Sequence, residues 1–431
     1  MLRVPPSRGS HPPRGLTGAV LCVAVLGGCE ANRPPTAPDP GSPAGRDSSP
    51  PSPVSPPSPP LGTGPESCAN GHAGDFPCDG VSLRSRIALD VMGGTFGNDL
   101  WGWSDGEAGP EYALMGLNTG TAFVDVTNPE DPVFLGRLPT ETEASFWRDI
   151  KVYRDHAFIV ADGAGAHGMQ VFDLARLRGS AASRTFEADA VYREFESAHN
   201  LAINEETGFA YAVGSDTCER GLHIVDLRVP ANPQFRACHA AAPVHDVQCV
   251  VYRGVDAEHL DREICISSNE DHVAVVDVAD KSAIRNLSSI TYPELGFVHQ
   301  GWLTPDHRFF LLGDEFDETD FGVPTRMHVF DVSDLDAPEY LFPYELETVA
   351  TDHNLYVRGN LVFAANYSSG LRVLEIGELV NRELRQVAFF DTFPQNDDVH
   401  LEGAWSVYPY LPSGTVIVSD IHNGLFVLSL P

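Results

Sequence analysis

The stretch Gly221-Leu222-His223-Ile224-Val225-Asp226-Leu227 indicates the fold of the whole chain. It predicts a β-strand, because it is rich in branched apolar residues, follows a glycine and leads into a proline-containing turn. The pattern occurs seven times along the 431 residues, and each copy carries an acidic residue or, in the last copy, a serine. These marker residues are Asp125, Asp173, Asp226, Asp277, Asp331, Glu375 and Ser429. Their spacing of 44 to 54 residues is typical of propellers and solenoids.

Each repeat is expected to contain four strands. In the third repeat the strands are residues 200–203, 208–213, 222–227 and 234–238, with Asn232-Pro233 at the turn before the fourth strand. The first strands of the seven repeats are expected to begin near Asp99, Arg148, His199, His245, His299, His353 and Glu402. Seven units of this kind predict an all-β protein, a seven-bladed β-propeller.

The last repeat ends with its third strand, Leu425–Leu430, and so lacks a fourth. The N-terminal segment Leu83–Leu89 resembles the fourth strand of the first repeat, Val133–Pro139. We expect this segment to complete the last blade, because that arrangement closes the ring and leaves no open sheet edge. A linear solenoid would need capping repeats, and the sequence shows none.

The recurring aspartate of the repeat is expected to be structural. It closes the third strand just before a turn, where a carboxylate accepts hydrogen bonds from backbone N–H groups. Its replacement by Glu375 and Ser429 in the last two repeats fits a residue that can be exchanged without loss of function.

Residues 1–28 are predicted to be a signal peptide. A basic start is followed by the short apolar segment Leu16–Leu26, which is too short to span a bilayer. The next residues, Leu26-Gly27-Gly28-Cys29, resemble the lipobox of bacterial lipoproteins, which implies that Cys29 carries a lipid. Glu30 stands where such lipoproteins carry an aspartate if they stay at the inner membrane, so the outer membrane or cell surface is favoured. An ordinary secretory signal with a chance cysteine is the alternative.

Residues 29–65 are predicted to be the lipidated cysteine and a linker. Thirteen of the 34 prolines fall within residues 34–65, and such a composition favours extended polyproline II over a packed core. A tether is the expected role, with a proline-rich ligand for another domain as the alternative. The propeller domain is then expected to span residues 66–431.

The cysteines also predict export. Of eight cysteines, Cys22 and Cys29 belong to the signal and the lipid site, which leaves six. An even number in an exported domain indicates disulfides. The expected strand map favours the pairs Cys68–Cys78, Cys218–Cys238 and Cys249–Cys265. A cysteine metal site is not favoured, because no Cys-x-x-Cys pair occurs.

The charge balance excludes nucleic acid as a partner. The formal net charge is −32, and removing the three arginines of residues 1–28 leaves −35 for the rest of the chain. Phosphate backbones and anionic lipid surfaces would be repelled by this charge. Cations and cationic partners are the natural counterparts, unless the charge serves only to keep an exposed protein soluble.

Residues 66–430 resemble the choice-of-anchor B proteins, and the repeats resemble LVIVD repeats, which are named for a strand such as Leu222–Asp226. The stretches that carry the resemblance are Glu66–Cys78, His245–Tyr252, Arg262–Glu270, His299–Leu303, Asp352–Tyr356 and Gly403–Pro409. The resemblance implies an exported propeller displayed at the surface through an anchor, here a lipid on Cys29. It implies no established activity.

A histidine opens the first strand in four consecutive repeats. The first strand of a propeller blade lines the central channel, so we expect these histidines to form an arc around one mouth of it. The second strands end at the same mouth with carboxylates and amides, and imidazoles among carboxylates bind Zn²⁺, Mn²⁺ or Fe²⁺. The candidate metal ligands are His199, His245, His299, His353, Asp246, Glu270, Asp314 and Glu315. Because the histidines belong to four blades, one ion is expected to use two or three of them.

Roles without a metal are the alternative for the residues at this mouth. A histidine at a strand start can hydrogen-bond the backbone of the next blade and never bind metal. The acidic segment Asp314–Asp320 is expected to be a solvated loop, since it lacks the glycine and glutamate spacing of an EF-hand calcium loop.

Two functions remain open from the sequence. Gly-x-Ser-x-Gly, Ser-x-x-Lys, P-loop and Gly-x-Gly-x-x-Gly patterns are missing, which favours a surface-displayed binding module for a protein or glycan ligand. The alternative is a metal-dependent extracytoplasmic enzyme, hydrolase-like, that activates a water molecule on an ion at the histidine mouth.

Overall fold

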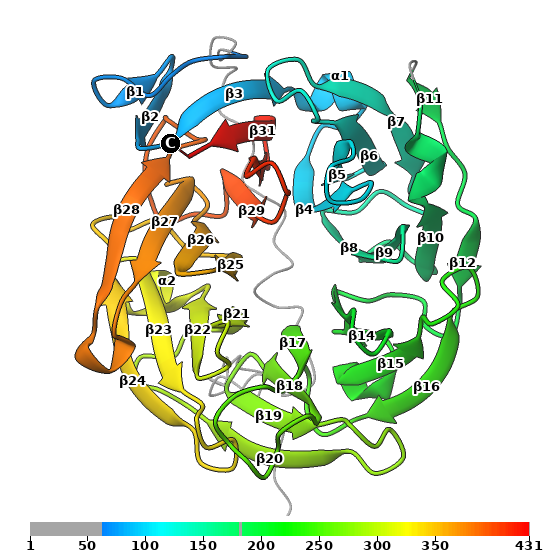
Figure 1. Cartoon of the computed structure of the whole chain (residues 1–431), viewed down its shortest axis with the longest axis vertical. Helices are drawn as coiled ribbons and strands as arrows, with labels where there is room; N and C mark the ends of the chain where they lie inside the picture. The colour runs from blue at the N-terminus through cyan, green and yellow to red at the C-terminus, as the bar shows by residue number, and fades with distance from the viewer. Residues whose placement is uncertain (1–62, 181–182, 431) are drawn as a thin grey trace, which may run out of the picture. The chain divides into compact units, whose positions relative to one another are not determined.

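The computed structural model describes residues 63–180 and 183–430. These residues form seven mainly antiparallel sheets of four or more strands, arranged in a ring (Figure 1). The predicted all-β, seven-bladed β-propeller is confirmed. The predicted signal peptide, the lipid site at Cys29 and most of the proline-rich linker lie outside the described residues.

The blades follow one another along the chain, and in each the first strand is innermost. The strands of blades 1 to 4 are β4 (Gly97–Ser104), β5 (Glu111–Leu117), β6 (Gly120–Asp125) and β7 (Val133–Pro139); β8 (Trp147–Tyr153), β9 (His156–Asp162), β10 (Met169–Asp173) and β12 (Ala190–Tyr192); β13 (Asn200–Asn204), β14 (Phe209–Val213), β15 (Leu222–Asp226) and β16 (Gln234–His239); β17 (Asp246–Val251), β18 (Glu263–Ser268), β19 (Val273–Asp277) and β20 (Arg285–Ile290).

The remaining blades continue this order. Their strands are β21 (Val298–Leu303), β22 (Phe309–Asp314), β23 (Arg326–Asp331) and β24 (Glu339–Glu345) in blade 5; β25 (Leu355–Arg358), β26 (Leu361–Ala365), β27 (Leu371–Ile376) and β28 (Leu384–Phe390) in blade 6; β29 (Ala404–Tyr408), β30 (Val416–Asp420), β31 (Gly424–Ser429) and β3 (Ser82–Ile87) in blade 7.

The repeat strand is apolar on both sides because each blade packs between two others. In β15, Leu222 and Ile224 point into the core shared with blade 4, whereas Val225 and the following Leu227 belong to the core shared with blade 2. Alternate residues of a strand face opposite sides of its sheet, so a strand covered on both faces reads as a nearly continuous apolar run. This packing explains why the pattern recurs once per blade.

The ring closes through the N-terminal strand, as predicted. Strand β3 pairs antiparallel with β31, for example Leu83 with Leu428 and Ile87 with Leu425. In Figure 1 the blue β3 therefore lies beside the red β31. The last blade combines both ends of the described chain, which leaves no open seam between blades 7 and 1.

Several short elements were not expected from the sequence. Strand β2 (Phe76–Asp79), extended by β1 (His72–Ala73), adds to the outer edge of blade 6, and β11 (Arg184–Thr185) pairs in parallel with β7. The short helices and 3₁₀ turns are α1 (Leu89–Met92), α2 (Asp317–Phe321), η2 (Leu174–Leu177), η3 (Cys218–Arg220) and η4 (Leu379–Asn381).

The recurring aspartates are structural, as predicted. Each accepts a hydrogen bond from the backbone N–H two residues further on, which tightens the turn after the third strand. The donor–acceptor distances are 3.0 Å for Asp125, 2.9 Å for Asp173, 3.0 Å for Asp226, 3.1 Å for Asp277 and 2.9 Å for Asp331.

The described residues contain the disulfides that the strand map predicted, Cys68–Cys78, Cys218–Cys238 and Cys249–Cys265. Cys249 and Cys265 face each other on the neighbouring strands β17 and β18. Disulfides indicate an extracytoplasmic protein. Among the described residues, no helix has the length and apolar character needed to cross a membrane.

Candidate functional site

The four histidines that open the first strands form a stacked arc at one mouth of the channel. The ring centroids lie 4.5 Å apart between His199 and His245, 4.3 Å apart between His245 and His299, and 4.3 Å apart between His299 and His353. The series continues into aromatic rings, since His353 lies 4.6 Å from Tyr367. The sequence predicted the shared mouth, and the structure shows that neighbouring imidazoles are in contact.

Hydrogen bonds to the next blade orient two of these rings. The Nδ1 of His245 lies 3.0 Å from the carbonyl oxygen of His299, and the Nδ1 of His353 lies 2.5 Å from that of Trp405. A carbonyl only accepts, so each Nδ1 carries the proton and each Nε2 of a neutral ring presents a lone pair. The expected backbone contact between blades therefore exists, and it also prepares Nε2 as a metal ligand.

Glu315 brings two of the histidines into a set that could hold a metal ion. It follows strand β22, is fully buried, and its carboxylate oxygens lie 3.8 Å from the Nε2 atoms of both His299 and His353. Ligand atoms of these three residues all lie within 4.8 Å of one another. The hydroxyl of Tyr367 donates to Glu315 over 2.8 Å and fixes its orientation. Two imidazoles and one carboxylate suit Zn²⁺ or Fe²⁺.

The other predicted ligands have different surroundings. His199 pairs with Asp162 over 3.1 Å, and hydrogen bonds from His199 and Ser197 bring the pKa of Asp162 to about 2, although burial alone would raise it. Glu270 lies 3.5 Å from Arg220, and burial raises its pKa despite that arginine.

Two predicted ligands do not join the histidines as expected. Asp314 is fully buried and accepts hydrogen bonds from the Tyr292 hydroxyl at 2.7 Å and the backbone N–H groups of Gly296 at 2.8 Å and Phe297 at 2.6 Å. Asp246 directly follows His245 but lines a separate cavity of the channel, near Lys151. Successive residues of a strand point to opposite sides, which separates this pair.

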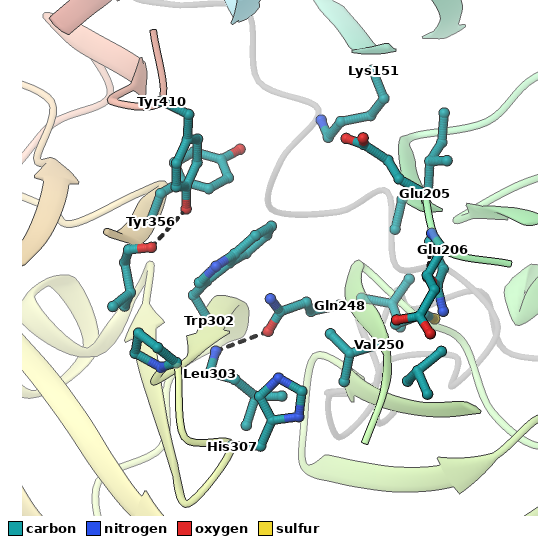
Figure 2. A pocket seen from close by; sticks show the side chains of 18 of the residues that line it. Lys151, Glu205, Glu206, Gln248, Val250, Trp302, Leu303, His307, Tyr356 and Tyr410 are labelled. Carbon is teal, nitrogen blue, oxygen red and sulfur yellow. Dashed lines mark hydrogen bonds between the residues drawn. The ribbon is translucent and has the colours of Figure 1, made fainter. Parts of the chain in front are cut away.

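This cavity is the second feature of the channel. It has a volume of about 590 Å³ and is lined by residues of the first strands and of the loops after them (Figure 2). Strand β21 illustrates the polarity, since His299 stands near its start and Trp302 near its end. Five aromatic rings cover much of the wall, with neighbouring centroids 4.9 to 6.3 Å apart: Trp101, Trp302, Tyr356, Tyr408 and Tyr410.

Amide groups face the same cavity. The side-chain oxygen of Gln248 accepts from the backbone N–H of Leu303 at 2.8 Å, and that of Gln300 accepts from Leu355 at 2.9 Å. Both glutamines line the cavity, and these contacts use their oxygens, so their NH₂ groups are donors for a ligand. The sequence pattern did not predict this site. A signal was present, because a glutamine, a tryptophan and a tyrosine lie three residues after His245, His299 and His353, respectively.

An acidic cluster around one lysine closes the inner end of the cavity. Lys151 pairs with Asp149 and lies 3.4 Å from Asp99. Burial and the adjacent Asp149 raise the pKa of Asp99, whereas Lys151 and hydrogen bonds lower that of Asp149 despite its burial. Burial raises the pKa of Asp246 to about 7 against the opposing effect of Lys151, so this carboxyl changes charge near neutral pH.

The acidic segment Asp314–Asp320 is not the solvated loop that the sequence predicted. Asp314, Glu315 and Asp317 are fully buried, and Glu318 is 2% exposed. The segment runs from the end of β22 into helix α2, which carries Asp317 and Glu318 into the protein instead of into solvent. Asp317 is held there by Arg326, whose Nε lies 2.8 Å from its Oδ2, and by His328 at 3.2 Å.

Comparisons with known proteins support the fold and assign no activity. No protein-family model and no curated protein matches the chain. A solved structure from Lactobacillus plantarum matches with a TM-score of 0.52 and 12% identity over 75% of this chain and 89% of its own. A functionally unknown protein from Desulfotomaculum acetoxidans gives 0.51 and 9% over 71% and 88%.

A periplasmic gluconolactonase, PpgL of Pseudomonas aeruginosa, is also similar in structure. Its TM-score is 0.45 at 12% identity, over 68% of this chain and 87% of the lactonase. A similarity this low carries no argument about the activity of the present chain. Likenesses at such identities show a shared fold alone.

Proposed function

We propose that the protein is an exported, lipid-anchored β-propeller whose channel cavity binds a small neutral sugar or the end of a glycan. The observation that carries this proposal is the cavity of about 590 Å³ with its wall of aromatic rings. Its volume lies within the range of about 300–1,000 Å³ that ligand pockets in proteins occupy.

The lining favours a flat, uncharged, polar ligand. The indole of Trp302 and the ring of Tyr356, 4.9 Å apart at their centroids, offer apolar surfaces for the CH face of a sugar ring. The NH₂ groups of Gln248 and Gln300 donate to hydroxyl oxygens, and the carboxylate of Glu205 accepts from hydroxyl groups. The acidic surroundings disfavour anionic ligands.

The anchoring part of the proposal is supported by the signal sequence, the lipobox and the disulfides. Its test is the variant Cys29→Ser, expressed in a bacterium that lipidates proteins. We expect the unchanged chain in the detergent phase of the membrane fraction and the variant in soluble form. A variant that stays with the membrane would contradict the lipid anchor and leave the binding proposal intact.

Ligand binding can be followed by tryptophan fluorescence, since Trp101 and Trp302 both line the cavity. The probes are neutral disaccharides of glucose and of N-acetylglucosamine, with choline as a cationic probe and glucuronate as an anionic one. We expect a saturable signal with a neutral sugar that is lost in Trp302→Ala. The matched control is Trp147→Ala, at the histidine end of β8.

Each result of this titration supports, changes or refutes the proposed ligand class. Sugar binding that Trp302→Ala abolishes and Trp147→Ala preserves supports the proposal. Binding of choline in place of every sugar would replace the ligand class by an organic cation. A cavity that binds none of the probes, or a sugar signal that Trp302→Ala leaves unchanged, would refute the proposed function.

A metal-dependent enzyme is the second candidate, and the set His299, Glu315 and His353 favours it. These residues fit a transition metal, because two Nε2 atoms and one carboxylate converge. Such an ion would supply Lewis acidity and an activated water molecule. Within the chain, Tyr367 holds Glu315 and the carbonyl of Trp405 holds His353, so that the ligands are preorganised.

Elemental analysis by mass spectrometry tests this second candidate. The purified protein is compared with His299→Ala plus His353→Ala and with the control His239→Ala, whose Nε2 contacts Asn286 at 2.8 Å on the outer strands. We expect close to one equivalent of a transition metal in the unchanged protein and in the control, and none in the double variant. Equal metal content in all three would exclude the histidine mouth.

A further inference from the structure

The disulfide Cys218–Cys238 has different surroundings from the other two disulfides of the described residues. It joins the turn η3, just before β15, to the outer strand β16 of the same blade. Cys238 is exposed and Cys218 is half-buried. Each of the other two disulfides contains a cysteine that is at most 1% exposed, Cys78 in one and Cys265 in the other. A thiol in solution therefore has the easiest access to Cys218–Cys238.

The backbone of η3 has an unfavourable conformation. Cys218, Glu219 and Arg220 have φ values of 53°, 52° and 67°, the longest run of positive φ in the described part of the chain. Residues that carry a side chain adopt this left-handed region singly, because Cβ then approaches the following carbonyl oxygen. Such strain persists only where the surrounding structure holds it. The disulfide fixes the first residue of the turn, so its reduction allows the turn to relax.

A histidine lies beside the sulfur of Cys218. Nδ1 of His223 is 3.8 Å from this Sγ and 2.8 Å from Oγ1 of Thr217, and Nε2 is 2.8 Å from the hydroxyl of Tyr192. Burial lowers the pKa of His223 to about 4, so the ring is neutral at neutral pH. In the tautomer that accepts the Tyr192 hydroxyl at Nε2, Nδ1 donates toward Sγ and stabilises a thiolate there.

The same turn holds the backbone at the histidine mouth. The carbonyl oxygen of Arg220 accepts from the backbone N–H groups of Gly214 at 3.1 Å and Val244 at 3.0 Å, and Val244 directly precedes His245. The guanidinium of Arg220 also lies 3.5 Å from the carboxylate of Glu270. A change in the conformation of η3 therefore acts on the chain segments that form this mouth.

We propose that Cys218–Cys238 is a reversible thiol–disulfide exchange site for low-molecular-weight thiols, and that its reduction loosens the backbone at the histidine mouth. Strained and exposed disulfides are the ones that exchange with thiols, whereas buried ones resist. The inference is independent of the sugar proposal, since η3, His223 and Cys238 do not line the cavity.

The exchange takes place in two steps. A thiolate attacks Sγ of the exposed Cys238 and forms a mixed disulfide, and the electron pair of the broken S–S bond passes to Sγ of Cys218. This sulfur takes up the proton that the attacking thiol has lost. A second thiol then attacks the small-molecule sulfur of the mixed disulfide and releases Cys238 as a thiol. Two thiols have become one small-molecule disulfide, and the protein has gained two thiols.

The test equilibrates the purified full chain with mixtures of reduced and oxidised glutathione. Free thiols are blocked with iodoacetamide, and the labelled cysteines are identified by mass spectrometry. We expect Cys218 and Cys238 to be labelled at glutathione ratios that leave Cys68–Cys78 and Cys249–Cys265 oxidised, and to be oxidised again when the ratio is reversed. Resistance of Cys218–Cys238, or reduction of another disulfide at the same ratio, would overturn the proposal.

The variant Glu219→Gly tests the strained turn, because glycine adopts positive φ without the steric penalty. The equilibrium constant for reduction by glutathione should fall by about twofold to fivefold in this variant. The matched control is Asp261→Gly, an exposed residue of blade 4 with a φ of 61°, which should leave the constant unchanged. An equal constant in Glu219→Gly and the unchanged chain would refute the role of η3.

Hydrogen exchange measured by mass spectrometry tests the coupling to the histidine mouth. In the reduced protein, exchange of the backbone N–H groups of Gly214 and Val244 should be faster by about tenfold or more, because the carbonyl of Arg220 no longer holds them. Strand β23, in blade 5, is the internal control and should exchange at the same rate in both forms. Unchanged exchange at Gly214 and Val244 after reduction would overturn the proposed switch.

Discussion

The imidazole rings of His299 and His353 stack with their centroids 4.3 Å apart, and the Nε2 atom of each lies 3.8 Å from the carboxylate of Glu315. Two positive imidazolium rings at this separation would repel each other by about 4 kcal/mol at an effective dielectric constant of about 20. The contact therefore disfavours protonation of both rings at the same time, and a neutral ring is the form in which histidine binds metal.

A metal bound by this pair should be released by acid. Protons compete with the metal for Nε2, so we expect metal content to fall when the protein is dialysed at pH 5 instead of pH 8. The measurement is elemental analysis after dialysis, with far-ultraviolet circular dichroism to show that the blades stay folded. Retention of metal at pH 5 would place the ion on ligands other than histidine.

Asp246 should make the protein less stable as the pH rises. Its pKa is about 7 in the folded protein and near 3.8 in the unfolded chain, so the folded state binds the extra proton between these values. The stabilisation is complete below about pH 4 and is lost as the pH rises through 7. Relative to Asp246→Asn, the free energy of unfolding should fall by about 2 to 3 kcal/mol between pH 5 and 7.

Urea unfolding of both proteins at pH 5, 6, 7 and 8 measures this difference. In the comparison with the asparagine variant, the contributions of the other titrating groups to the free energy of unfolding cancel, because both proteins contain these groups. A difference that does not change with pH would show that Asp246 is already ionised at pH 5.

His167 should have the opposite effect at lower pH. It is fully buried, accepts from Nη1 of Arg148 at 3.1 Å, and burial together with that arginine lowers its pKa to about 4. The unfolded chain then binds a proton that the folded protein does not, so stability falls as the pH drops from about 6.5 to 4 and is constant below. The loss should reach about 3 kcal/mol.

The variant His167→Gln should unfold with a smaller acid dependence, since glutamine keeps an acceptor for Arg148 and does not titrate. His156→Gln, a half-buried residue at the start of β9, is the control and should retain the full dependence. Thermal unfolding at pH 4.5 and 6.5 provides the comparison. Identical acid dependence in the unchanged protein and His167→Gln would show that His167 is not the responsible group.

Removal of strand β3 should open the ring. A chain that begins at residue 89 exposes the edge of β31, from Gly424 to Ser429, which pairs with β3 in the complete blade. Exposed strand edges recruit other strands, so we expect dimers and aggregates in size-exclusion chromatography with light scattering. A chain that begins at residue 63 is the control. Like the full chain, it should elute without these dimers and aggregates. A stable monomer beginning at residue 89 would contradict the role of β3 in closure.

The sequence was sufficient for the blades because their signal is local. The apolar run in β15 and the aspartate at its end depend on one strand and one turn; the run recurs in each repeat, and the aspartate in five of the seven. The closing strand could be inferred because Leu425–Leu430 left one blade incomplete. The disulfides followed from the same strand map, since Cys249 and Cys265 had to face each other once their strands paired.

The site depended on contacts that no local pattern encodes. Asp317 and Glu318 have the composition of a solvated loop, but both are buried, and Asp317 forms an ion pair with Arg326 of β23. The choice of His299 and His353 over the other histidines required the position of Glu315, which directly follows the second strand of blade 5. The cavity joins aromatic rings from four blades, and their convergence follows only from the closed ring.

The path of the chain into the ring has a mechanical consequence. Residues 63–66 run along β3, with Arg86 N–H bonded to the Thr63 carbonyl at 2.9 Å, and β2 is bonded to blade 6. The Cys68–Cys78 disulfide links the two. A pull from the N-terminal side is therefore divided between blades 6 and 7 before it reaches the strand that closes the ring. A propeller built in this way can be pulled from its N-terminal side without being unzipped from that end.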